Sequence, residues 1–363
     1  MAEIDKSLPN TDTNPLGEEI DIEQVKEAEI IDTDAGPVEI DMTEDGGAEV
    51  SFDPNAVEPE GMGHFDNLAE VLDEQVGDSL ASELTDKYKD YKQSRQEWVE
   101  SYREGLNLLG FKYVTRTEPF RGASSVTHPV LAEAVTQFQA QAYKELLPAD
   151  GPVRSQILGA STVEKEEQSK RVKDFMNYQI MDQMKEYEPE FDQMLFYLPL
   201  SGSTFKKVYY DDLLGRAVSK FIPAEDLVVP YSATSLEDAE AIIHVIRISQ
   251  NDLRKQQING FYKDIDLGEP PVQQDQLKDK ELELEGIQAN GTEDMYTLLE
   301  MHVNLDLEGY EDVNPEDGEP TGVRLPYIVT IDDANGKILS IRRNFKAEDP
   351  LKKKINYFVQ FKF

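Results

Sequence analysis

The spacing of the apolar residues changes near Pro199, and this change constrains the fold more than any other feature of the chain. From residue 65 to residue 198, apolar residues recur every three or four positions, a spacing typical of amphipathic helices. Beyond Pro199 the spacing becomes two, which is typical of β-strands. Helices followed by strands predict an α+β fold, in which long amphipathic helices pack with a mixed or antiparallel β region.

The first helical stretch follows directly on an acidic N-terminal segment. Residues 68–88 place an apolar residue at every fourth position, and residues 98–106 resume the pattern after a polar stretch. We expect two helices here, with a break near Gly77, and an end at Gly110.

A second pair of helices is predicted between residues 161 and 200. Ser161 and Glu164 have the spacing of a capping box, which predicts the start of a long helix. Pro189 can occupy the first turn of the next helix, because its missing N–H would have no partner there. We expect the apolar side of the first helix in the core, since a Met-rich face is usually core. That side consists of Val172, Met176, Ile180 and Met184.

The β-rich half contains one strong hairpin signal and two acidic interruptions. Asn335-Gly336 lies between two apolar runs, the best short-range indication of a tight hairpin. Residues 264–294 are acidic and rich in glutamine, and predict an exposed insertion. An acidic loop with Pro and Gly follows at 308–322. The predicted strands are Thr204–Tyr210, Ala217–Ile222, Leu227–Val229, Ala241–Ile248, Tyr296–Leu305, Tyr327–Ile331 and Lys337–Ile341, and a short helix is predicted around Asp252–Ile258.

Acidic residues dominate the charge of the chain. The formal net charge is −37, and residues 1–60 hold 19 Asp and Glu against Lys6 and Lys26. Low hydrophobicity with self-repelling charge predicts a disordered arm over residues 1–62. Such an arm could instead mimic nucleic acid or dock a basic partner. We divide the chain into this arm, a mainly helical region over 63–200 and a β-rich region over 201–363. Because the remainder is acidic too, tight binding of a DNA duplex is not expected.

The segment from Phe120 to Val153 joins a polar loop to a predicted helix. Residues 121–125 are small and polar, and Thr127 followed by Pro129 is typical of a helix start. Leu147-Pro148 ends the helix, and Asp150-Gly-Pro152 turns the chain. One face of the helix carries Leu131, Val135, Phe138, Ala142 and Leu146.

As a string, this segment resembles the corresponding part of portal proteins of podovirus-type tailed bacteriophages. The shared pattern is a Phe-x-Gly-Ala-Ser loop, His-Pro, an Ala/Gln-rich helix and Leu-Pro-x-x-Gly-Pro-Val, matched by residues 120–153. A looser resemblance extends over residues 65–363, through the predicted helices of 161–200, Thr204–Val229 and Ile338–Asn344. Portal chains continue beyond the position that corresponds to Phe363, so we expect a chain that is incomplete there.

The resemblance implies a structural protein rather than an enzyme. Portal subunits form a ring of twelve at one vertex of the virion capsid, around a channel for the packaging and ejection of double-stranded DNA. The implied partners are identical subunits, the terminase motor, capsid and scaffolding proteins, and tail or adaptor proteins. DNA would pass without sequence-specific binding. The implied location is the portal vertex of the virion, after assembly in the bacterial host cytoplasm.

The residues themselves indicate no catalytic, cofactor-binding or metal site. The chain has no cysteine, and its four histidines, His64, His128, His244 and His302, are far apart in sequence. Residues 32–43 fail as a calcium loop, because Pro37 and Thr43 stand where Gly and Glu are needed. No phosphate-binding loop, nucleophile elbow or dinucleotide fingerprint occurs, and no apolar run reaches the ~20 residues of a membrane helix.

Two further functional classes stay open from the sequence. A carboxylate-dependent hydrolase could have its catalytic pair among the 73 Asp and Glu residues. A monomeric binding module could use the acidic arm. One basic concentration, at residues 342–354, could contact phosphates or a neighbouring subunit, although we expect a solvated loop face. It consists of Arg342, Arg343, Lys346 and Lys352–Lys354.

Overall fold

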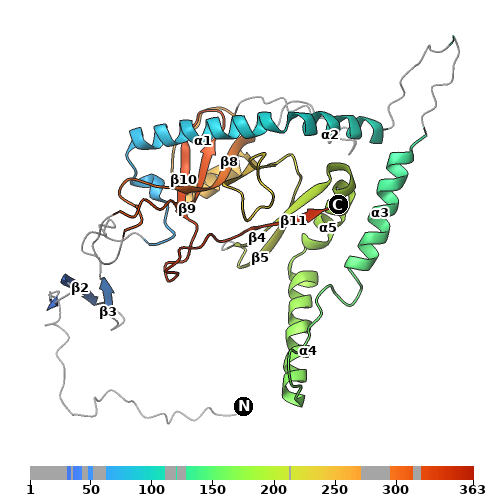
Figure 1. Ribbon diagram of the computed structural model, residues 1–363, viewed down its shortest axis with the longest axis horizontal. Helices are drawn as coiled ribbons and strands as arrows, with labels where there is room; N and C mark the ends of the chain where they lie inside the picture. The colour runs from blue at the N-terminus through green and yellow to red at the C-terminus, as the bar shows by residue number, and fades with distance from the viewer. Residues whose placement is uncertain are drawn as a thin grey trace, which may run out of the picture. The chain divides into compact units, whose positions relative to one another are not determined.

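The computed structural model confirms the α+β class, with six helices and two antiparallel sheets in its main unit (Figure 1). The chain forms two compact units, one from Met1–Met62 with Val313–Thr321 and one from Gly63–Asp312 with Gly322–Phe363. The structure describes residues 63–110, 120, 128–211, 214–270, 295–313 and 320–363, together with the backbone of three strands between residues 31 and 51.

The first unit contains three short strands that the sequence analysis had not predicted. They form an antiparallel sheet of order β1-β2-β3, and Val313 pairs with Pro320 in an isolated bridge. A signal was present, because residues 38–42 alternate apolar and acidic side chains. The disorder predicted for the rest of residues 1–62 lies outside the described residues and stays a prediction. The strands are β1 (Ile31–Thr33), β2 (Gly36–Met42) and β3 (Ala48–Ser51).

Helices α1 (Glu74–Ser94) and α2 (Gln96–Leu109) are the predicted first pair, but the predicted break near Gly77 is wrong. Gly77 lies inside α1, and the break falls at Arg95. The Arg95 guanidinium donates hydrogen bonds to the carbonyl oxygens of Ala224 (3.0 Å), Glu225 (2.5 Å) and Leu227 (3.1 Å). The position of the break between α1 and α2 is therefore set by a long-range contact and not by a local glycine.

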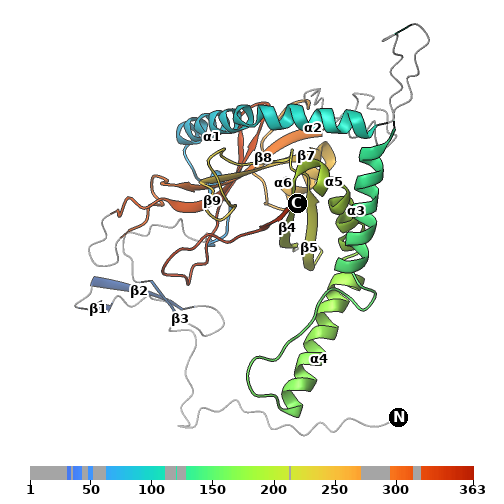
Figure 2. The same cartoon turned by 45° about the vertical axis from the view of Figure 1, so that its right-hand side comes forward.

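Helices α3 (Val130–Leu146), α4 (Val163–Tyr178) and α5 (Tyr187–Ser201) follow, with a π-helical turn at Gln179–Gln183 between the last two. Helix α3 packs along α5 (Figure 2). Of the predicted α3 stripe, Val135 is buried and Leu146 is 55% exposed. The helix α4 is capped by Thr162, whose hydroxyl accepts from Lys165 N, so the predicted Ser161–Glu164 capping box is wrong.

The core position predicted for the apolar side of α4 is also wrong within this chain. No residue of α4 is buried, and Val172 and Met176 are 48% and 42% exposed. Ile180 and Met184, beyond the end of α4, are half-buried. The pattern identified an apolar face correctly, but no element of the described chain covers it.

A five-stranded antiparallel sheet of order β10-β9-β8-β7-β6 forms the larger part of the β region. Helix α1 contacts the edge strands β10 and β6 and runs across the sheet (Figure 1). The hairpin predicted at Asn335-Gly336 is confirmed between β9 and β10. The strands are β6 (Leu227–Val228), β7 (Ala241–Ser249), β8 (Met295–Leu305), β9 (Leu325–Asp332) and β10 (Ile338–Arg343).

A smaller antiparallel sheet of order β11-β4-β5 packs between helix α5 and the larger sheet. Its strands are β4 (Ser203–Asp211), β5 (Arg216–Ile222) and β11 (Phe358–Lys362). Side chains alternate between its faces. Phe361 packs with the α5 cluster, whereas Phe205 and Phe358 pack with Ile242 of β7. Strand β11 therefore completes the sheet that begins with β4 and β5, the two strands that follow α5 in the sequence.

Two short helices complete the main unit. A 3-10 helix spans Leu68–Glu70, and α6 (Gln250–Ile258) confirms the short helix predicted around Asp252–Ile258. It begins after Ser249, whose hydroxyl accepts from Asp252 N. The predicted insertion 264–294 begins too early, because Leu267 is buried, and residues 271–294 lie outside the described residues. Within the described part of the chain, no helix is long and apolar enough to cross a membrane.

The turn that ends the α3 segment depends on Gly151. Its φ is +89°, and a Cβ there would lie 2.4 Å from the Asn177 side chain. The Asn177 amide accepts from Val153 N (2.9 Å) and donates to the carbonyls of Asp150 (3.3 Å) and Val153 (3.2 Å). The Gly-Pro-Val segment of the sequence signature is thus held against α4 by one side chain.

We expect Gly151→Ala to destabilise the protein more than Gly159→Ala, as measured by urea denaturation. Gly159 has a similar φ of +92° with nothing within 4 Å, so its alanine variant meets only the backbone cost of ~1–2 kcal/mol. Gly151→Ala must in addition displace Asn177, whose hydrogen bonds contribute ~0.5–1.5 kcal/mol each. Equal losses in the two variants would contradict the role assigned to Asn177.

Candidate functional site: a buried charge cluster between two sheets

Four charged or titratable side chains gather where the small sheet meets the large one. Glu300 lies on β8, and the Lys207 ammonium of β4 donates to both of its carboxylate oxygens, at 2.5 and 2.7 Å. The side chains of Lys207 and Glu300 are 14% and 13% exposed, so the pair is largely withdrawn from water. Since β4 and β8 belong to different sheets, this ion pair is a polar link across an otherwise apolar interface.

Two histidines complete the cluster. His302 Nε2 lies 2.9 Å from Glu300 Oε1, and its side chain is 3% exposed. His244 of β7 is directly opposite Glu300 in the strand register, with Nδ1 3.9 Å from the same oxygen. That distance is too long for a hydrogen bond, and His244 Nδ1 has no hydrogen-bond partner among the described residues. One carboxylate therefore has a lysine and a histidine as hydrogen-bond partners and a second histidine close by.

The environment shifts the pKa values of Glu300 and His302 downwards for different reasons. Burial alone would raise the pKa of Glu300, but the Lys207 charge and the two histidines outweigh it and hold that pKa well below its usual range. Burial lowers the pKa of His302, and the nearby Lys207 charge acts in the same direction, against the hydrogen bond to Glu300. At neutral pH the cluster thus holds an ionised carboxylate beside a neutral His302.

Aromatic rings surround the charged groups. The Phe358 ring centroid is 5.0 Å from that of His302 and 5.9 Å from that of His244. The Lys207 ammonium lies 5.5 Å from the Tyr209 centroid and 5.8 Å from the Phe358 centroid, within the range of cation–π attraction. These rings reduce the contact of the charged groups with water, which strengthens the electrostatic interactions inside the cluster.

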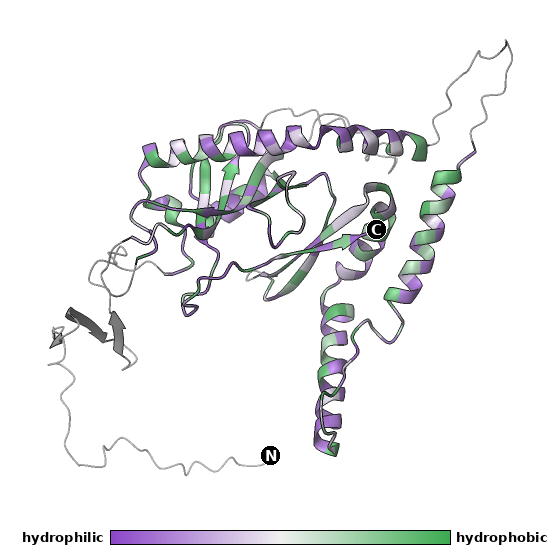
Figure 3. Ribbon diagram, in the orientation of Figure 1, coloured by the Kyte–Doolittle hydropathy of each residue, from purple (hydrophilic) through white to green (hydrophobic). Residues whose placement is uncertain are grey.

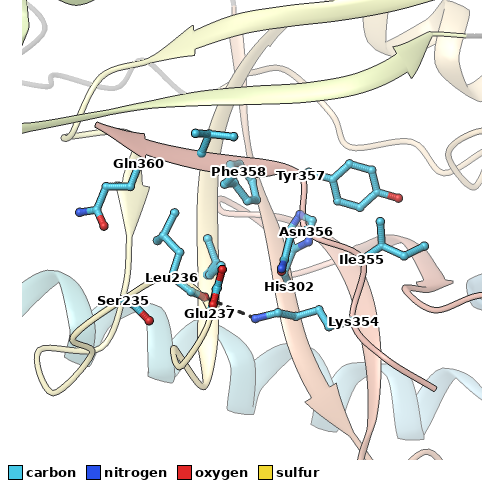
Figure 4. Close-up of a pocket in the computed structure, with 12 residues that line it drawn as sticks. Ser235, Leu236, Glu237, His302, Lys354, Ile355, Asn356, Tyr357, Phe358 and Gln360 are labelled. Carbon is cyan, nitrogen blue, oxygen red and sulfur yellow. Dashed lines mark hydrogen bonds between the residues drawn. The ribbon is translucent and has the colours of Figure 1, made fainter. Parts of the chain in front are cut away.

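His302 also lines a pocket of about 410 Å³ between the 235–237 loop and the segment that leads into β11 (Figure 4). Lys354 lies across it and donates to the Leu236 carbonyl at 3.5 Å. Burial lowers the pKa of Lys354, and Glu237 and Asp238 oppose that shift. Because His302 gives its hydrogen bond to Glu300 and Ser235 donates to Asp238, the described lining contains no paired nucleophile and base.

No residue of this cluster was predicted from the sequence as a site residue, because the four histidines are far apart along the chain. A signal did exist: Glu300 and His302 are two polar residues at alternate positions of an apolar strand, and so share one face. The other two histidines lie elsewhere, His64 beside the Phe345 carbonyl (2.9 Å) and His128 exposed before α3. In the described ranges, no His, Asp and Glu residues form a group of three that could hold a metal ion.

The basic residues between positions 342 and 354 make more contacts with the rest of the main unit than the predicted solvated loop face would make. Arg342 donates to the carbonyls of Phe65 (2.6 Å) and Phe261 (2.9 Å) and lies over the Phe261 ring. Lys352 pairs with Asp312 at 2.6 Å. Lys346 and Lys353 are exposed, as predicted for the whole group. Most of these cations therefore connect segments of the main unit.

A separate buried lysine lies on the opposite face of β4. Lys206 is 4% exposed, and its Nζ has no hydrogen-bond partner among the described residues. The ammonium lies 4.1 Å from the centroid of Tyr187 on α5. Burial lowers the pKa of Lys206 to about 8, although Glu190 and Glu186 act to raise it.

No model of a known protein family matches the chain, and a comparison with curated proteins found no match either.

We expect Lys207→Met to lower the free energy of unfolding by ~3–5 kcal/mol, because it leaves the Glu300 charge buried without its cation. The double variant Lys207→Met/Glu300→Gln should recover much of this loss. Urea denaturation of the wild type, the two single variants and the double variant gives the double-mutant cycle that measures the coupling between the two residues. The control is Lys89→Met, which breaks an exposed pair with Asp86 and should cost less than ~1 kcal/mol. Additive losses in the cycle would contradict the coupling.

We expect Lys206→Met to stabilise the protein by ~1 kcal/mol near neutral pH, since it removes a buried ammonium that has no hydrogen bond. The pKa of about 8 in the folded state lies below the ordinary 10.5, so the unfolded state binds more protons between these values. Wild-type stability should therefore gain from this group as pH rises from about 8 to 10.5, and the variant should lack that gain. Lys220→Met, at an exposed position of β5, is the control in urea denaturation.

Proposed function

We propose that the chain is the structural subunit of a portal ring of a tailed bacteriophage, the head-to-tail connector through which DNA is packaged and ejected. The proposal starts from the resemblance carried by residues 120–153. In the structure, the later part of that signature is the helix α3 with the turn that Gly151 makes against Asn177. The Phe-x-Gly-Ala-Ser loop falls almost entirely outside the described residues.

The uncovered apolar side of α4 is the observation that carries the proposal. Exposed Val172, Phe175 and Met176 lie on a helix with no buried residue. Figure 3 shows apolar and polar residues alternating along α4, which extends away from both sheets. A helix is stabilised in proteins mainly by packing one face. A second copy of the chain is the cover that a ring would supply.

The charge of the protein suits the same proposal. The chain is strongly acidic and contains no cysteine. An acidic wall repels a DNA duplex weakly at physiological salt, because charges are screened beyond ~8 Å. Such a wall lets DNA slide without being held. The ATP chemistry of packaging would then belong to a separate motor.

Light scattering after size-exclusion chromatography, with negative-stain imaging of the same sample, tests the proposal on the protein expressed from its full reading frame. We expect closed rings of about twelve subunits. A stable monomer would argue against a portal subunit and in favour of a binding module. Turnover of an ester or phosphodiester substrate by that monomer would favour a hydrolase.

We expect Phe175→Ser to reduce self-association of the protein, measured as mass against concentration by light scattering. Phe175 is 58% exposed, and burying a large apolar side chain at an interface contributes ~1.5–3 kcal/mol. Lys170→Ser is the control, because residue 170 is exposed and points away from Val172 and Phe175 around the helix. Equal effects of the two substitutions would remove α4 from the proposed interface.

A further inference from the structure

The contact between the two sheets combines apolar packing with one set of buried charges. Phe205 and Phe358 of the small sheet pack with Ile242 of β7, and the Lys207–Glu300 pair lies beside them. At neutral pH the pair contributes one positive and one negative charge, so the interface is electrically balanced. Any charge added there would be hydrated only weakly.

Protonation of His302 would unbalance this interface. Lys207 and a charged His302 would then share a single buried carboxylate, and the repulsion between the two cations is weakly screened at such burial. The His302 side chain is 3% exposed and lies against the Phe358 and Tyr357 rings, whose centroids are 5.0 and 5.7 Å from its own, so a charge on it would be hydrated only weakly. The other titratable or charged groups around the cluster are Tyr209 of β4, His244 of β7, Tyr262 after α6, and Lys354 and Glu237 across the pocket.

Protons can reach His302 without unfolding of the protein. His302 lines the pocket of about 410 Å³ (Figure 4). The pocket opens to the surface, because its lining also includes the exposed residues Asn356, Val359 and Glu237. The segment over the pocket leads into β11, which pairs only with β4 among the described strands. The small sheet can thus separate from the large one without loss of a backbone ladder between them.

We propose that the Glu300 cluster is an acid-sensitive joint, at which the β11-β4-β5 sheet is released from the five-stranded sheet when His302 becomes protonated. The joint is a property of this unit, and it does not depend on the function proposed above. It gives the protein two arrangements of the same folded sheets.

The sign of the effect follows from the two shifts. The pKa of His302 is lower in the folded protein than its ordinary 6.5. The contribution of neutral His302 to the stability of the interface is therefore complete above pH 6.5 and is lost as the pH falls below 6.5. The pKa of Glu300 is also lowered, so a second loss follows only as pH falls below its ordinary 4.5. The joint should therefore weaken first in the histidine range, while Glu300 is still ionised.

Hydrogen exchange of the whole chain, followed by mass spectrometry at about pH 7.5 and about pH 5.5 and corrected for intrinsic rates, tests the joint. We expect protection of Ser203–Asp211 and Phe358–Lys362 to fall roughly 3- to 10-fold at the lower pH. The hairpin Leu325–Arg343 should keep its protection. An equal loss in both regions, or none in either, would overturn the proposal.

His302→Gln should abolish the selective loss, because its amide can still donate to Glu300 but does not titrate. His128→Gln, which removes an exposed histidine, should leave the loss intact. A His302→Gln variant that retains the full loss would assign the effect to another group. If that variant does not fold, nuclear magnetic resonance titration of the wild-type histidines decides, since the proposal fails if His302 titrates at or above the ordinary range.

Discussion

The ion pair between Lys207 and Glu300 is the constraint on which the arrangement of the main unit depends. β4 carries Lys207 on one face and packs against α5 with the other, and β11 and β5 pair with its two edges. Fixing Lys207 on Glu300 therefore positions α5 and both partner strands against the large sheet. A buried pair of this kind adds little net stability over an apolar contact. A shift of β4 by one residue would exchange its two faces, so that Lys207 would point towards α5 and the neighbouring Lys206 or Val208 would take its place beside Glu300.

Helix α5 extends this arrangement from the sheets to the helices. Glu186 holds Arg216 of β5 by two hydrogen bonds (2.6 and 2.9 Å), and Glu190 accepts from Phe221 N at 2.5 Å. On its other side α5 contacts α3, whose Phe138 and Ala142 pack with Phe191 and Leu195. α4 alone among these helices has no buried residue. The other helices thus bury an apolar face within the main unit, whereas the apolar face of α4 is not covered by any described element.

Most of the charged groups that could suggest chemistry in this protein serve to connect segments. Arg95, Arg342 and Lys352 each bind carbonyl or carboxylate groups from distant parts of the chain. The cluster around Glu300 differs, because it combines a neutral buried histidine, an ionised carboxylate and a pocket. This combination suits a response to protons.

The sequence by itself determined the α+β class, the order of most helices and strands of the main unit, and the hairpin at Asn335-Gly336, because these follow from local periodicity and turn chemistry. It did not determine the break at Arg95, which depends on carbonyls some 130 residues away. Nor did it reveal the cluster around Glu300. The residues of this cluster come from three strands, and only strand register and burial bring them into contact. Periodicity also gave α4 an apolar face, but only the tertiary structure decided that this face lacks a cover within the described chain.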